Sequence, residues 1–146
     1  MSKSNACENS LLLLLFNNTD FALIGDAGGL QNSATAGSFY VSLHTADPTD
    51  ASDQTTSETA YGSYARQAVA RSGAGFVVTG NSVSPAANID FPECTATPGG
   101  AITHFGIGTS ISGAGVLLYK GAVSPSITVA VGVIPRIKST STITED

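Results

Sequence analysis

The residues best able to do chemistry lie between positions 44 and 71. His44 and Asp47 are close enough to pair beside a serine, as a base and its orienting carboxylate do in nucleophilic catalysis. Arg66 or Arg71 could bind an anion. On the polar face of a strand, however, a histidine more often meets solvent or a cross-strand partner, and an arginine more often meets a carboxylate. We therefore expect structural roles for all four side chains.

Other patterns that could form a site are incomplete. Residues 113–115, Gly-Ala-Gly, lack the later glycine of a dinucleotide loop and the lysine of a phosphate loop. Residues 108–112 lack the final glycine that a nucleophile elbow requires. Asp47, Asp50 and Asp53 recur at every third position, without the alternating ligands and central glycine of a calcium loop. The sequence predicts no enzyme, no cofactor and no metal site.

The two cysteines add no metal site or disulfide framework. Cys7 and Cys94 are far apart in sequence, and neither has zinc-ligand spacing to His44 or His104. Two free thiols are the expectation for a reducing cytosol, with a Cys7–Cys94 disulfide as the alternative.

Composition limits the classes of partner. Charged residues are only 12% of the 146, the net charge is −5, and the six basic residues are scattered, so no stripe follows a phosphate backbone. The strongest apolar run, residues 11–16, is too short to span a membrane or to form an ordinary signal-peptide core. We expect no nucleic-acid partner and no membrane, with synthesis in a host cytoplasm.

The elements that must position these residues are short strands. In residues 37–48, Phe39, Val41 and Leu43 alternate with polar neighbours, which predicts a half-buried strand ended by Pro48. Gly80 and Asn81 form the clearest hairpin turn. Further strands are expected at residues 61–70, 76–79, 82–84, 88–91, 103–107, 116–119, 127–133 and 140–144.

This spacing predicts a mainly β fold. We expect an antiparallel β-sandwich of about eight short strands with one short N-terminal helix, and a jelly roll is one arrangement that fits. The sequence predicts a flexible arm over residues 1–8 and a single domain over residues 9–146. The helix is expected over about residues 10–24, capped by Asn9 or Ser10.

Two surfaces are candidates for contact with other subunits. The helix is apolar all round, so it is either buried in its own domain or docked on a neighbouring subunit. Its candidate interface residues are Leu11, Leu12, Leu14, Leu15 and Phe16. The loop at residues 49–59, almost without apolar residues, is expected to be a solvated surface loop and a second contact, through Asp50, Asp53 and Glu58.

Several motifs together resemble one family. They are Leu-His-Thr-Ala-Asp-Pro (43–48), Gln-Thr-Thr-Ser-Glu (54–58), Tyr-Ala-Arg (64–66), Val-Ala-Arg-Ser-Gly-Ala-Gly-Phe (69–76), Thr-Gly-Asn (79–81), Thr-His-Phe-Gly-Ile-Gly-Thr (103–109), Gly-Ala-Gly-Val-Leu-Leu-Tyr (113–119) and the terminal Thr-Glu-Asp. With these motifs, nearly the whole chain resembles a family of small tailed-bacteriophage virion proteins. The resemblance implies a virion structural protein.

Three functions follow as hypotheses. The first is a capsid decoration (cement) protein on the outer head surface, which bridges major capsid subunits and self-associates as a dimer or trimer. The second is a tail or tail-fibre-associated structural subunit, with tail proteins as partners. The third is a carbohydrate-binding module that contacts host glycans, although the chain lacks tryptophan for stacking on sugar rings.

Overall fold

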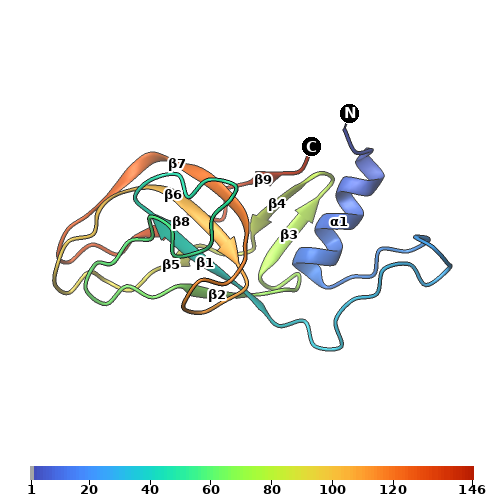
Figure 1. Cartoon of the computed structure of the whole chain (residues 1–146), viewed down its shortest axis with the longest axis horizontal. Coiled ribbons are helices and arrows are strands. Elements are labelled where there is room, and N and C mark those ends of the chain that lie inside the picture. The colour runs from blue at the N-terminus through green and yellow to red at the C-terminus, as the bar shows by residue number, and fades with distance from the viewer. Residues whose placement is uncertain (1) are drawn as a thin grey trace. The chain divides into compact units, whose positions relative to one another are not determined.

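The computed structural model describes residues 2–146, which form two compact units. The first unit combines the segments up to Ser38, Ala70–Asn88 and Lys138–Asp146, and the second combines Phe39–Val69 and Ile89–Ile137. The elements, shown in Figure 1, are α1 (Asn5–Asn17), β1 (Ser38–His44), β2 (Gln67–Ala70), β3 (Phe76–Thr79), β4 (Ser82–Pro85), β5 (Ile89–Asp90), β6 (Gly100–Gly108), β7 (Leu117–Val129), β8 (Arg136–Ile137) and β9 (Ile143–Thr144). The pairs β1–β6, β3–β4, β4–β9, β5–β8 and β6–β7 are antiparallel, so the predicted mainly β, antiparallel class with one short helix is confirmed.

In the first unit, α1 packs against the β3–β4 hairpin (Figure 1). Leu12 and Phe16 are fully buried, one helical turn apart on the same face. The Phe16 ring meets Phe76 of β3 edge to face, with ring centroids 4.9 Å apart. The predicted two-residue turn is confirmed, because Thr79 pairs with Ser82 and Gly80 has a φ of 60°. β9 pairs with β4 and completes a three-stranded sheet.

The helix begins and ends earlier than predicted. Ser4 caps it by accepting a hydrogen bond from the Cys7 amide, so residues 5–8 belong to the helix and not to an arm. Glu8 adds a favourable negative charge in the first turn. At the other end Asn18 adopts a left-handed conformation, with φ of 53°, and its amide bonds to the Leu13 carbonyl. The prediction of a helix over residues 10–24 was therefore wrong at both bounds.

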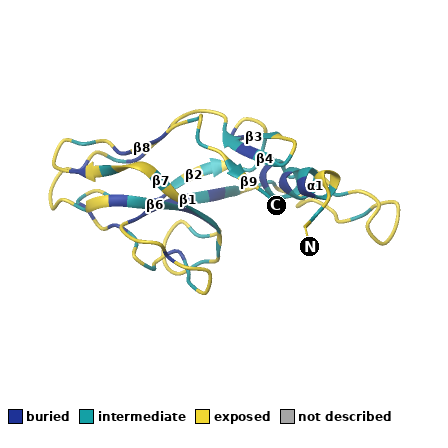
Figure 2. Ribbon diagram, turned by 90° about the horizontal axis from the view of Figure 1, so that it is seen from above, coloured by how far each residue is buried: buried dark blue, intermediate teal, exposed yellow. Residues whose placement is uncertain are grey.

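In the second unit, four strands form a sheet in the order β2-β1-β6-β7, and β5 pairs with β8. Phe39, Val41 and Leu43 of β1 are buried as predicted, together with Ile102 and Ile107 of β6. Figure 2 shows the buried stretches along β1. Ser42 and His44 are also fully buried, which corrects the prediction of a half-buried strand. The reason is that the loop after β1 folds back on the strand: the Thr45 amide donates to the Ser57 carbonyl, and the Thr59 amide donates to the Leu43 carbonyl.

The strand β7 also differs from expectation. Two strands were predicted, at residues 116–119 and 127–133, whereas one strand of 13 residues runs from Leu117 to Val129. Its pairing with β6 shifts register between Ile107 and Gly108 and again between Ile102 and His104. Such bulges let the strand continue past residues that do not fit the ladder.

Two smaller points complete the fold. Cys7 is half-buried and Cys94 is buried, and both are free thiols. Among residues 2–146, no helix has the length and apolar character that crossing a bilayer requires.

Candidate functional site

His44 and Asp47 have separate partners in the structure. The His44 Nδ1 lies 2.8 Å from the Thr56 carbonyl oxygen, and its Nε2 lies 2.8 Å from the Ser42 hydroxyl. Because a carbonyl only accepts, Nδ1 carries the proton, and Nε2 then accepts from Ser42. Burial lowers the pKa of His44, which favours this neutral ring.

The Ser42–His44 pair is similar to the nucleophile and base of a hydrolase, but its surroundings do not suit catalysis. Both side chains are fully buried, so a substrate could not reach the serine oxygen. The second ring nitrogen of His44 faces a backbone carbonyl instead of a carboxylate. The pair therefore holds the loop after β1 against the strand.

Glu58 forms the centre of a second polar cluster in the same unit. Its carboxylate accepts two hydrogen bonds from Arg66, each 2.7 Å long, and one of 2.8 Å from the Tyr64 hydroxyl. Arg66 also donates to the Ser110 carbonyl at 2.9 Å. The hydrogen bond with Glu58 raises the pKa of Arg66, and burial raises the pKa of Tyr64. Arg66 thus serves as an internal cross-link. This agrees with the expectation that it pairs with a carboxylate of the protein and does not bind an anionic ligand.

The predicted solvated loop is only partly solvated. Gln54 is fully buried, donates to the Tyr40 carbonyl and accepts from the Ser110 amide at 2.9 Å. Glu58 lies in the polar cluster described above, and its carboxylate is turned to Arg66 and not to solvent. Asp53 bonds to the amide and hydroxyl of Thr55 and stabilises the turn, and these bonds lower its pKa. Asp50 has 97% of its side chain exposed, and its role as a contact stays a prediction.

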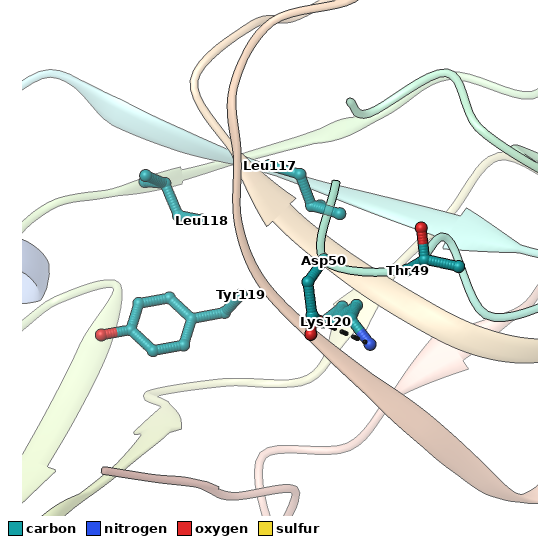
Figure 3. A pocket seen from close by; sticks show the side chains of 6 residues that line it. All are labelled: Thr49, Asp50, Leu117, Leu118, Tyr119 and Lys120. Carbon is teal, nitrogen blue, oxygen red and sulfur yellow. Dashed lines mark ion pairs between the residues drawn. The ribbon is translucent and has the colours of Figure 1, made fainter. Parts of the chain in front are cut away.

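A shallow hollow of about 180 Å³ lies where this loop meets β7 (Figure 3). It is lined by Thr49, Asp50 and residues 117–120. The Lys120 ammonium lies 2.9 Å from Asp47 and 3.3 Å from Asp50, and Figure 3 shows the second of these pairs. The hydrogen bond with Asp47 raises the pKa of Lys120, and the same bond, with one from the Thr49 amide, lowers the pKa of Asp47.

The charges around this hollow do not favour an anionic ligand. One ammonium faces two carboxylates, which leaves no unpaired cation to attract an anion. No group of three or more metal-ligating side chains occurs within residues 2–146. The hollow combines the polar side chains of Thr49 and Asp50 with residues 117–120 of β7, of which two are leucines.

The helix residues divide into two sets. Leu12 and Phe16 are fully buried inside their own unit, which leaves neither any exposed surface for the predicted contact with a partner. Leu11, Leu14 and Leu15 are half-buried and keep part of their surface open. Arg71 donates to the carbonyls of Leu14 and Leu15 at the end of α1 and to that of Ala36, so it caps the helix.

Sequence reasoning missed the roles of Gln54 and Tyr64. Gln54 lies in a polar stretch without alternation, and Tyr64 lies in the predicted strand at residues 61–70, whose two faces do not differ clearly in polarity. The one available signal was the spacing of Glu58, Tyr64 and Arg66, which places a carboxylate within reach of its donors across one turn.

One comparison with known proteins decides the family. A family model described as podophage GP4 fiber I protein gp80 matches residues 2–144 of the chain. The chain belongs to this family. No curated protein matches it. Membership in the gp80 family confirms the resemblance to tailed-bacteriophage virion proteins and makes the chain a phage structural protein of the virion.

Proposed function

We propose that this gp80-family protein is a structural subunit of the phage tail fibre or of its attachment to the tail. The observation that carries the proposal is the family match, which covers residues 2–144 and is described as a fiber protein. The tail-fibre function stood second among the hypotheses drawn from the sequence. Capsid decoration stood first, and the family match favours the tail-fibre alternative over it.

The interior of the second unit suits a load-bearing part. Its loops are held by polar contacts, from His44 of β1 to Thr56, and between loops from Gln54 to Ser110 and from Arg66 to Glu58. Among the described residues, every buried side-chain nitrogen and oxygen has a hydrogen-bond partner. Satisfied polar networks make loops rigid. The protein therefore acts, in this proposal, by passive contact and without catalysis.

The partners in this proposal are other tail proteins and further copies of the same chain. The half-buried leucines of α1 offer one contact, through Leu11, Leu14 and Leu15. Asp50 offers another, because its side chain is almost fully exposed at the rim of the hollow.

Copy number and position on the virion test the proposal. Quantitative mass spectrometry of purified particles would give the molar ratio of this chain to the major capsid protein, and gold-labelled antibodies would locate it by electron microscopy. We expect a few to tens of copies per particle, with label on the tail. Particles from a phage with a nonsense mutation in the gene provide the antibody control. A molar ratio near that of the capsid protein, with label over the head, would establish the decoration function instead.

A further inference from the structure

The segment that follows β1, residues 45–59, is held against that strand partly by the ring of His44. The Nδ1 atom donates to the Thr56 carbonyl oxygen at 2.8 Å, and the backbone of His44 forms an isolated bridge with Glu58. Apart from this bridge, the segment contains neither helix nor strand. Its position therefore depends on individual contacts, and the contact with His44 is one of them.

The other nitrogen of the His44 ring faces the interior of the unit. Nε2 accepts a hydrogen bond of 2.8 Å from the Ser42 hydroxyl, and both side chains are fully buried. A Cβ on Gly106 of β6 would lie 2.8 Å from Nε2 and 2.7 Å from the Ser42 oxygen, so the pair packs directly on the β6 backbone. A proton added at Nε2 would place a positive charge in this enclosed position, which is unfavourable without water or a counter-ion.

The charged groups around the ring do not compensate for such a charge. Glu58 on the covering segment attracts it, but this carboxylate is already bonded to Arg66. Arg66 itself and His104, which lies opposite His44 on β6, both oppose a positive ring. Burial opposes it most and lowers the pKa of His44. A protonated His44 is therefore unfavourable while the segment covers it.

On β7, the nearby charge is paired with the segment itself. Lys120 lies 2.9 Å from Asp47 and 3.3 Å from Asp50, so its ammonium has carboxylate partners on the segment and does not compete for the ring. These two ion pairs are exposed on the carboxylate side and hold the segment only weakly.

Backbone strain inside the segment favours its release. Thr49 and Ser57 have positive φ values, of 64° and 54°. This conformation is unfavourable for residues with a β-carbon, above all for a β-branched one such as threonine, and it persists only where surrounding contacts impose it. Ser57 directly follows Thr56, which is bonded to the His44 ring. Loss of that bond therefore lets this part of the segment relax.

We propose that residues 45–59 form a latch that opens when His44 takes up a proton. Protonation turns Nε2 from an acceptor into a donor, so the Ser42 hydroxyl has to turn its own hydrogen away from the ring. Opening the latch admits water to the charged ring and releases the strain at Ser57. The sheet β2-β1-β6-β7 stays paired, because its ladder consists of backbone bonds that do not involve the ring. The inference concerns the second unit alone and does not depend on the proposed function.

Amide hydrogen exchange of the purified full-length chain tests the latch. The amides of Thr45 and Thr59, which donate to the Ser57 and Leu43 carbonyls, report whether it is closed. The closed latch disfavours the charged ring, so its stability is complete above pH 6.5 and is lost as the pH falls below that value. After correction for the intrinsic exchange rate at each pH, we expect the protection of these two amides to fall by about tenfold per pH unit.

Comparison with the ladder separates opening of the latch from unfolding of the whole unit. Amides of the β1–β6 ladder should stay more strongly protected than those of Thr45 and Thr59 at every pH. Urea below the unfolding transition should not accelerate exchange of the latch amides, because local opening exposes little surface. Latch amides that are as protected as the ladder, or whose protection does not change with pH, would overturn the proposal.

Two histidine variants identify the group that takes up the proton. His44→Gln keeps a donor and an acceptor but gains no proton in this range, so the protection of its latch should not fall with pH. His104→Gln, on the neighbouring strand, keeps the His44 ring and is the matched control. Circular dichroism would show that both variants fold, and the exchange of the unaltered chain tests the latch in either case. Opening in acid that persists in His44→Gln, or that disappears in His104→Gln alone, would refute it.

Discussion

Arg66 binds Glu58 through two parallel hydrogen bonds, from Nε to Oε1 and from Nη2 to Oε2, each 2.7 Å long. Arg66 is 6% exposed, so the pair lies largely out of water. Its remaining Nη1 donates to the carbonyl of Ser110, just past the end of β6. One arginine thus connects two loops that are 52 residues apart in sequence, from position 58 to position 110.

Removing this arginine should destabilise the protein strongly. Arg66→Met keeps the apolar stem of the side chain but leaves the Glu58 carboxylate without its cation. Breaking a buried pair from one side typically costs about 3 kcal/mol or more. We expect a loss of about that size in the free energy of unfolding, measured by urea denaturation.

The exposed pair between Asp90 and Arg136 is the control. Both side chains are about half exposed, so Arg136→Met should leave stability nearly unchanged. Equal losses in the two variants would show that the burial of Arg66 does not decide its contribution.

His44 should make stability depend on pH in mildly acidic solution. Burial lowers the pKa of His44 below its ordinary value of 6.5, so the unfolded chain binds a proton more readily than the folded chain. Its stabilising contribution is complete above pH 6.5 and is lost as the pH falls from there toward the folded-state pKa. Denaturation curves at a series of pH values in this range should show a falling free energy of unfolding.

Replacing His44 by glutamine should reduce this slope. Glutamine retains a donor and an acceptor but has no proton to gain in this range. His104→Gln, on the neighbouring strand, leaves the buried ring of His44 in place and is the matched control. An unchanged slope in His44→Gln would assign the pH dependence to other groups.

The parts of the fold that were predictable are those set by neighbouring residues. The β3–β4 hairpin follows from Gly80 and Asn81 between two apolar runs, and Gly80 adopts the positive φ that such a turn requires. The inward face of β1 follows from the alternation that includes Phe39 and Val41. Both signals act over a few residues, so no distant contact could overturn them.

The parts of the fold that were predicted wrongly depend on contacts between residues far apart in the sequence. Ser42 and His44 read as an exposed face, yet the loop that contains Thr56 covers them. The candidate contact residues of α1 were likewise predictable only in part. The run of leucines around Leu12 was evident in sequence, but which of them face β3 depends on where the helix starts, and Ser4 sets that start.

Substitutions on the buried face of α1 should lower the free energy of unfolding more than substitutions on its half-buried face. Leu12→Ala removes a side chain that is fully enclosed, and such changes cost about 2–5 kcal/mol. Leu14→Ala removes a side chain that is half-buried, so we expect a clearly smaller loss. Thermal and urea denaturation of the two variants would measure the difference, and equal losses would contradict this division of the helix.

The half-buried face should matter for incorporation into virions. Leu14→Asp and Leu15→Asp each place a charge where a neighbouring subunit would contact the helix. We expect both variants to fold and to be depleted from purified particles, as measured by mass spectrometry against the major capsid protein. Asn5→Asp, at an exposed position of the same helix, is the matched charge control. Normal incorporation of the two leucine variants would remove α1 from the list of contacts.

Gly108 should be intolerant of a side chain because Gln54 occupies the space beside it. A Cβ at Gly108 would overlap the side chain of Gln54, which is fully buried and bonded to Ser110 and Tyr40. Gln54 cannot turn away without losing those bonds, so Gly108→Ala should lower the free energy of unfolding by about 1–3 kcal/mol. Urea denaturation would measure it.

The same substitution at Gly73 isolates the cause of that loss. Nothing lies within 4 Å of a Cβ at Gly73, so Gly73→Ala should be neutral or stabilising by less than about 1 kcal/mol. Combining Gly108→Ala with Gln54→Ala should cost less than the two single changes together, because the shortened side chain relieves the overlap. Additive losses in that double variant would show that the strain at Gly108 comes from the strand itself and not from Gln54.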